Sequence, residues 1–168
     1  MEVKMKKIAF ITTLLLLSSA LFSAPRFGYS VSGKGATLDH DYGGVSIGAV
    51  FEPFSYGICR MEASTTIGFD SLNGFCLSSF DVGLSTPLFR ILSPFDFLFV
   101  NKALWAPTLK GMATWNSSFD LEWAFSLSLL HFEDSSFRYD FLSPFLLVNK
   151  SFDKFGYGFD VLKISYVF

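Results

Sequence analysis

Strict alternation of apolar and polar residues is the feature that most constrains this chain, and it is clearest over residues 119–129. Every odd position there is apolar, whereas the even positions hold Ala, Ser or an acidic residue. Successive side chains of a β-strand point to opposite faces of the sheet, so this pattern predicts a strand with one apolar and one polar face. Eleven residues is also about the length that a tilted strand needs to cross a bilayer.

The same two-residue period recurs along the chain between turns that are rich in Gly, Asn, Asp and Pro. We interpret residues 87–102 as an irregular crossing, although dividing residues 87–107 into two short strands gives an alternative total of ten. Eight strands of ordinary length fit the chain better. The fold class is therefore all-β, and the eight predicted strands are residues 27–33, 45–51, 59–69, 75–86, 104–115, 119–129, 137–148 and 159–168.

The N-terminal residues have the composition of an export signal. A lysine-rich start precedes the uncharged run 8–17, and small residues follow it up to Ala20, the order typical of a secretory signal peptide. The run is about half of the roughly 20 residues that a membrane-spanning helix needs. We predict a signal-peptide helix over residues 1–20, cleaved after Ala20, and one barrel domain over residues 21–168.

Composition excludes several classes of protein. The predicted domain has no basic stripe of the kind that nucleic-acid binders show, so we expect no nucleic-acid partner. No segment after the signal approaches 18 uncharged apolar residues, which excludes helical membrane spans. The 22 Phe residues must nevertheless be buried or face an apolar medium. A closed barrel is the remaining structure that satisfies every backbone hydrogen bond inside a bilayer.

The last predicted strand ends the chain on an aromatic residue. Phe168 follows Tyr166, Ile164 and Leu162 at alternate positions, and Tyr166 is third from the end. This arrangement resembles the C-terminal assembly signal of small bacterial outer-membrane β-barrels. The resemblance implies an antiparallel up-and-down transmembrane barrel with both chain ends on the periplasmic side, and hence an even number of strands. It also implies location in the outer membrane, with outer-membrane lipid, the barrel-assembly machinery and periplasmic chaperones as partners.

The polar faces of the predicted strands carry charged residues that we expect to line the lumen, because a charge on the lipid face costs about 2–4 kcal/mol near the bilayer midplane. An eight-stranded lumen is only just wide enough to be filled by side chains, so we expect a salt-bridged plug. Arg138 is expected to pair with Glu62 or Asp140. In a soluble barrel the apolar faces would point inward and the charges would be solvated. The predicted lumen charges are Arg60, Glu62, Asp81, Asp120, Glu122, Arg138, Asp140 and Lys163.

Cys59 and Cys76 form an even pair in a chain that we expect to be exported, which favours a disulfide. In the predicted hairpin, however, about nine residues of strand, roughly 30 Å, separate them. Bridged Cα atoms must lie within about 7 Å of each other. We therefore predict two unpaired thiols on the apolar face, with an intermolecular bridge as the alternative.

The two histidines give little support for catalysis or metal binding. His40 lies between two aspartates in a predicted outer loop, which suits a solvated turn or a surface cation site. His131 precedes Glu133 and Ser135, a set that invites comparison with outer-membrane lipid deacylases, but the His-x-Ser spacing of that family is absent. No phosphate-binding loop, zinc pattern or nucleophile elbow is present. We predict no catalytic, cofactor-binding or metal-binding residues and no enzymatic activity.

Three functions are consistent with these patterns. The first is a non-enzymatic outer-membrane barrel with a structural or surface role and a largely plugged lumen. The second is a narrow channel or conduit for small or apolar solutes, and the third is a soluble periplasmic ligand-binding β-barrel. No sequence feature indicates a particular solute or surface partner.

Overall fold

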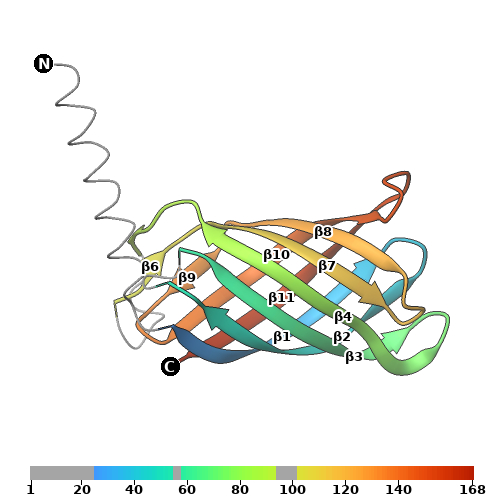
Figure 1. Cartoon of the computed structure of the whole chain (residues 1–168), viewed down its shortest axis with the longest axis horizontal. Helices are drawn as coiled ribbons and strands as arrows, with labels where there is room; N and C mark the ends of the chain where they lie inside the picture. The colour runs from blue at the N-terminus through green and yellow to red at the C-terminus, as the bar shows by residue number, and fades with distance from the viewer. Residues whose placement is uncertain (1–24, 55–57, 94–101) are drawn as a thin grey trace, which may run out of the picture.

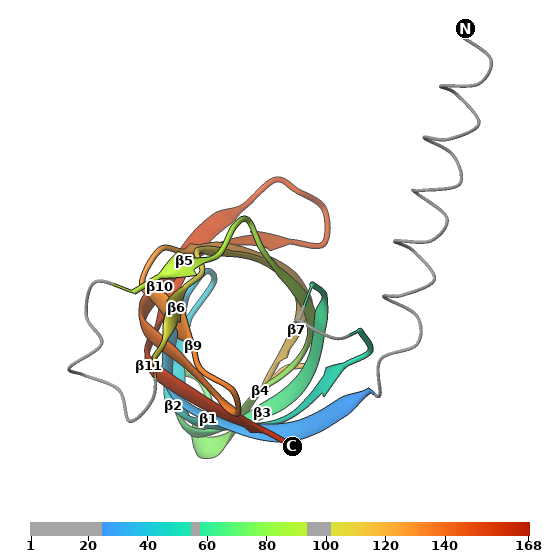
Figure 2. The same cartoon turned by 90° about the vertical axis from the view of Figure 1, so that its left-hand side faces the viewer.

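The computed structural model describes residues 25–54, 58–93 and 102–168, and these residues form a closed antiparallel β-barrel (Figures 1 and 2). Figure 2, which looks along the barrel, shows the strands as a continuous ring. The predicted signal peptide and most of the predicted irregular crossing lie outside the described residues.

Eight strands make up the wall, and each pairs antiparallel with the next. Pairing of the last strand with the first closes the ring, for example at Ser30 and Ser165. The prediction of an all-β, up-and-down barrel of eight strands is confirmed. The wall strands are β1 (Arg26–Thr37), β2 (Asp41–Glu52), β3 (Arg60–Asp70), β4 (Gly74–Pro87), β7 (Thr108–Asn116), β8 (Leu121–Ser128), β10 (Phe137–Asn149) and β11 (Phe155–Val167).

Three further short strands lengthen the wall at one end: β5 (Ile91–Leu92), β6 (Leu104–Trp105) and β9 (His131–Glu133). They continue β4, β7 and β8 respectively, because β6 pairs with both β5 and β9 just as β7 pairs with β4 and β8. Pro107 interrupts the predicted strand 104–115, since proline has no N–H to donate to a ladder. The ten-strand alternative is therefore wrong: the extra strands prolong existing ones.

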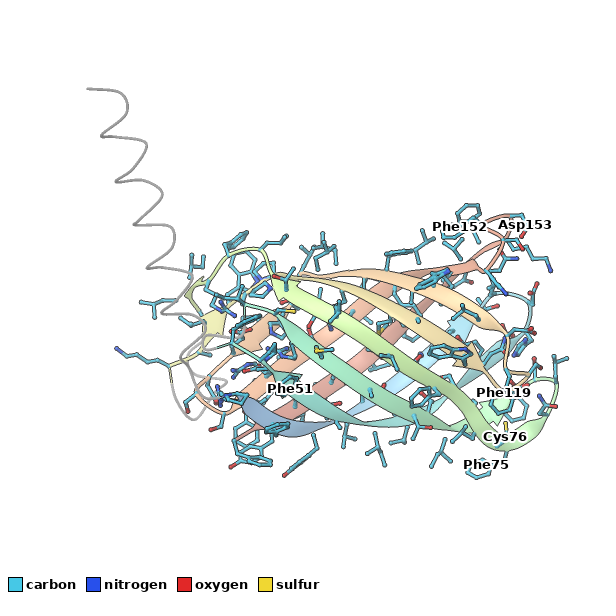
Figure 3. The ribbon with its side chains drawn as sticks, in the orientation of Figure 1. Phe51, Phe75, Cys76, Phe119, Phe152 and Asp153 are labelled. Carbon is cyan, nitrogen blue, oxygen red and sulfur yellow. The ribbon has the colours of Figure 1, made fainter. Side chains whose placement is uncertain are left out.

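Polar and apolar side chains occupy the opposite sides from those of a soluble protein. Along β8 the even positions are buried inside the barrel, whereas odd positions such as Phe125 and Leu127 are exposed on its outer face. Among the described residues, 29 polar or charged side chains are buried against 10 hydrophobic ones. Figure 3 shows the aromatic ring of Phe75 projecting away from the wall.

β-Bulges reverse the alternation within three wall strands. In β4, the adjacent residues Ser78 and Ser79 are both buried. The outward-facing residues are therefore the odd positions Phe75 and Leu77 before the bulge and the even position Phe80 after it. Cys76 therefore shares the inner face with Ser78, and its predicted position on the apolar face is wrong. Cys59 and Cys76 are both free thiols, as predicted.

The other two bulges lie side by side in β10 and β11. Leu142 has a φ of 65°, and both it and Phe141 are exposed. In β11 the adjacent residues Val161 and Leu162 are likewise both exposed. As a result Asp160 and Lys163 both face the interior although they are three positions apart.

The two ends of the barrel differ. The start of β1 and the C-terminus lie at the same end, which we call the termini end (Figure 1). Phe27 and Phe168 exchange backbone hydrogen bonds of 3.2 and 2.8 Å there, and β5, β6 and β9 prolong the wall on this side. The opposite far end consists of tight turns at residues 38–40, 71–73, 117–120 and 150–154. No helix in the described part of the chain is long and apolar enough to span a membrane.

Candidate functional site: the charged interior

Seven of the eight predicted lumen charges belong to the inner face of the wall. Arg60, Asp81, Glu122, Arg138, Asp140 and Lys163 are buried, and Glu62 is half-buried and bonded inside the barrel. Asp120 is the exception and its prediction is wrong. It is exposed in the turn before β8, because Phe119 adopts a φ of 63° and the strand begins only at Leu121.

At the termini end, two buried carboxylates hold four guanidinium groups. Glu52 accepts from Arg60 at 3.0 Å and from Arg138 at 3.4 Å. Glu133 accepts from Arg60 at 3.3 Å and from Arg90 at 2.8 Å, while Arg26 lies 3.7 Å from Glu52. We call these six residues the arginine cluster: Arg26, Arg60, Arg90, Arg138, Glu52 and Glu133.

The predicted partners of Arg138 are wrong. Its guanidinium bonds to Glu52 and to the backbone oxygens of Asp134 and Phe137. Glu62 is instead bonded to Lys163, and Asp140 to Lys110 at 2.9 Å. Two interior lysines therefore hold the carboxylates that the sequence assigned to Arg138.

The middle of the barrel is filled by a second group of bonded charges. Ser30 donates to Glu62 at 2.5 Å, opposite the Lys163 contact. His131 is fully buried, with Nδ1 at 2.7 Å from Asp140 and Nε2 at 3.2 Å from Glu133. This imidazole therefore connects the middle group to the arginine cluster.

A third group occupies the region toward the far end. Lys34 bonds to Asp81 at 2.6 Å, and its ammonium lies 5.7 Å from the centre of the Phe145 ring. Tyr42 and Asn116 donate to the two oxygens of Glu122 at 3.0 and 2.9 Å. Charged and hydrogen-bonded side chains thus fill the interior along its length, and a small apolar cluster of Ala124, Phe145 and Leu147 packs among them.

Several interior charges were not predicted. Lys34 lies one residue beyond the predicted strand 27–33, whose end Gly33 and Gly35 indicate, yet β1 continues to Thr37. Glu52 likewise lies one residue beyond the predicted strand 45–51, although it is the last residue of β2. The alternation does indicate an inward-facing Lys34, since this residue occupies an even position, as do the buried residues Ser30 and Ser32.

The geometry around His131 differs from that of a hydrolase. A serine nucleophile needs a hydrogen bond to a ring nitrogen of the histidine base. Here both ring nitrogens face carboxylates, and Ser128 donates to Asp140 at 2.5 Å. In the described ranges, no three His, Cys, Asp or Glu side chains are grouped so as to hold a metal ion. No known family model, curated protein or solved structure matches this chain.

Proposed function

We propose that this chain is a non-enzymatic integral outer-membrane β-barrel with a structural or surface role and a lumen closed by ion pairs. The observation that carries the proposal is the reversed polarity of a closed barrel, apolar outside and charged inside. Soluble monomers rarely expose contiguous apolar patches of more than a few hundred Å². A bilayer is the solvent in which such an outer surface is stable.

The distribution of exposed charge supports this environment. Within the described ranges, every exposed charged side chain lies in a turn or at the end of the barrel, and the outer wall between the ends has none. This is the pattern expected of a wall with an apolar band, because lipid-facing charges are destabilising near the midplane. The exposed charged residues are Asp39, Asp41, Lys102, Asp120, Lys150, Asp153 and Lys154.

The interior argues against a soluble carrier. Ligand pockets for small apolar molecules are lined mainly by hydrophobic side chains. This lumen instead holds paired charges such as Lys163 with Glu62 and Lys110 with Asp140. A barrel that carried an apolar ligand would need the apolar faces of its strands to point inward.

The far end favours a limited surface role. By the resemblance of the last strand, the termini end faces the periplasm and the far end faces outward. The turns of the far end are three to five residues long, whereas barrels of this class usually carry their longer loops on the outer side. Adhesion through large outer loops is therefore disfavoured.

The test is to fractionate cells that express the full chain and to follow the protein on gels before and after boiling. A folded membrane barrel is expected in the outer-membrane fraction and should change its migration on boiling. Recovery of a folded protein in the soluble periplasmic fraction would contradict the proposal.

A further inference from the structure

A cleft of about 510 Å³ opens at the termini end of the barrel, beside the arginine cluster. The charged side chains in its lining are four basic and two acidic ones: Arg26, Arg90, Lys102, Arg138, Glu133 and Asp134. This is the part of the molecule where the wall is prolonged by β5, β6 and β9.

Among the described side chains at the cleft, basic groups outnumber acidic ones. The arginine cluster and the remaining cleft residues together carry five cationic side chains, four arginines and Lys102, against the carboxylates of Glu52, Glu133 and Asp134. This set of side chains favours an anionic ligand.

The two acidic residues of the lining are already engaged by the protein. Glu133 binds Arg60, Arg90 and His131. Asp134 accepts the backbone N–H groups of Ser136 and Phe137 at 2.8 and 2.7 Å. Both carboxylates are therefore already bonded to groups of the protein, which lowers their repulsion of an anion bound in the cleft.

The guanidinium groups are held in place before any ligand arrives. Arg26 donates to the backbone oxygens of Ser135 and Val167 at 2.6 and 3.0 Å. Arg138 is 4% exposed, and its Nε has no hydrogen-bond partner among the described residues; the nearest carboxylate oxygen, on Glu133, is 4.0 Å away. Fixed planar guanidiniums suit the tetrahedral oxygens of a phosphate group, which they bind through paired N–H donors.

Apolar side chains flank the basic cleft. Arg90 follows Leu88 and Phe89 and precedes Ile91 and Leu92, all four of which are exposed. β5 pairs with β6, so that Leu92 lies opposite Leu104, which lines the cleft. A ligand with an anionic head and an apolar tail would contact both surfaces at once.

We propose that this cleft binds a phosphate group, supplied in the membrane by the headgroup of an anionic phospholipid. The phosphate site follows from the cleft and its charges alone. The lipid as its source rests on the proposed membrane location, because the termini end then lies at the level of phospholipid headgroups in the adjacent leaflet.

The test uses the folded full barrel in a phosphate-free detergent, with Trp115 and Trp123 replaced by Phe so that Trp105 of β6 is the reporter. Its fluorescence is followed during titration with inorganic phosphate, with a short-chain phosphatidylglycerol and with the matched diacylglycerol, at constant ionic strength. We expect saturable changes with the first two and none with the third. Arg90→Gln and Lys102→Gln should each weaken binding of the phospholipid about tenfold.

Lys154→Gln, at the far end, is the control and should bind as the parent does. Each variant is scored only after its boiling-dependent migration shows a folded barrel. Lys102→Gln changes an exposed side chain and is expected to fold as the parent does. Binding of inorganic phosphate without the phospholipid would keep the site and overturn the lipid source. Equal binding of the diacylglycerol, or no saturable change with either phosphate ligand, would overturn the proposal. A soluble barrel that still binds phosphate would contradict only the proposed function.

Discussion

Arg138 is the most deeply buried arginine of the arginine cluster, and it bonds to Glu52 and to two backbone oxygens. Its guanidinium reaches Asp134 O at 2.6 Å, Phe137 O at 3.0 Å and Glu52 at 3.4 Å, and it is 4% exposed. Removing one partner of a buried pair leaves the other charge without compensation and costs about 3–5 kcal/mol. We expect Arg138→Ala to lower the free energy of unfolding by about 3 kcal/mol, measured by urea titration of the barrel refolded in vesicles.

The control for Arg138→Ala is Lys154→Ala. Lys154 bonds to Asp39 at 2.6 Å in the exposed turns of the far end, where the hydrogen bond and charge of Asp39 raise the pKa of Lys154. Solvent screens this pair, so its loss should not change stability measurably. Equal losses in the two variants would mean that the interior ion pairs contribute no more than a surface pair.

Gly158 marks a place where the wall has room for no side chain. It lies opposite Phe145, whose ring points into the barrel, and a Cβ at Gly158 would clash with that ring and lie 2.6 Å from the Gly35 oxygen. We expect Gly158→Ala to lower the unfolding free energy by about 1–3 kcal/mol through overpacking. At Gly33, in contrast, the nearest atom to a new Cβ is 3.8 Å away, so Gly33→Ala is the matched control and should be tolerated in the same urea titration.

At the scale of elements, periodicity was sufficient to predict all eight wall strands, because a two-sided wall imposes a two-residue pattern on each of them. It was insufficient at the bulges. A single extra residue reverses the faces, which moved Cys76 and Asp160 to the inner face without any change in composition. β5 and β6 are only two residues long, too short for a period to be recognised.

The interior pairings were predictable as a class but not individually. The alternation along each strand places the side chains of Glu62, Arg138 and Asp140 inside the barrel. Which of these side chains pair with each other depends on their depth along the tilted strands and on lysines that compete for the same carboxylates. Lys110 lies in a segment where Gly111 and Met112 blur the alternation, so the partner of Asp140 was not identified. The sequence therefore predicts a charged lumen more reliably than it predicts its bonds.

The strand β8 gives a direct test of the outer face. Leu127 is exposed in the middle of the wall, and an arginine there would face lipid, which costs about 2–4 kcal/mol at the midplane. We expect Leu127→Arg to reduce the folded fraction after refolding into vesicles, measured by boiling-dependent migration. Phe119→Arg, in the exposed far-end turn, should fold as the parent does; a Leu127→Arg barrel that also folds normally would indicate that β8 faces water.

At the level of the whole molecule, a change of the C-terminal residue Phe168 is expected to reduce assembly in cells without affecting folding in vitro. Phe168 is 68% exposed, and the structure ties it to Phe27 through backbone atoms. Phe168→Ala keeps those bonds, so refolding in vitro should match the parent. In cells we expect the outer-membrane level to fall severalfold without a loss of export, because the aromatic ring is proposed as the assembly signal. Normal outer-membrane levels would remove Leu162, Ile164, Tyr166 and Phe168 from that role.

The two ends of the barrel differ in structure and in charge. The far end is closed by short turns, whereas the termini end combines the arginine cluster, the basic cleft and the prolonged wall. Between them, ion pairs such as Lys34 with Asp81, Lys110 with Asp140 and Lys163 with Glu62 lie inside the barrel, and they are the basis of the proposed closed lumen. Under the proposed function, we expect interactions at the termini end and no transport along the barrel axis.

Conduction across planar bilayers tests this closure. The wild-type barrel should give no large, stable steps, because Arg138 bonds to Glu52 and Arg60 bonds to Glu133, in each case between strands that are not neighbours in the wall. Arg138→Gln removes one of the cations that contact Glu52 and should introduce small steps that are selective for cations, since the carboxylate is then less fully neutralised. Lys154→Gln, which alters only the far-end turns, should remain silent. Large porin-like steps from the wild type would show that the interior pairs do not block the lumen, and the narrow-channel function would then replace the plugged barrel.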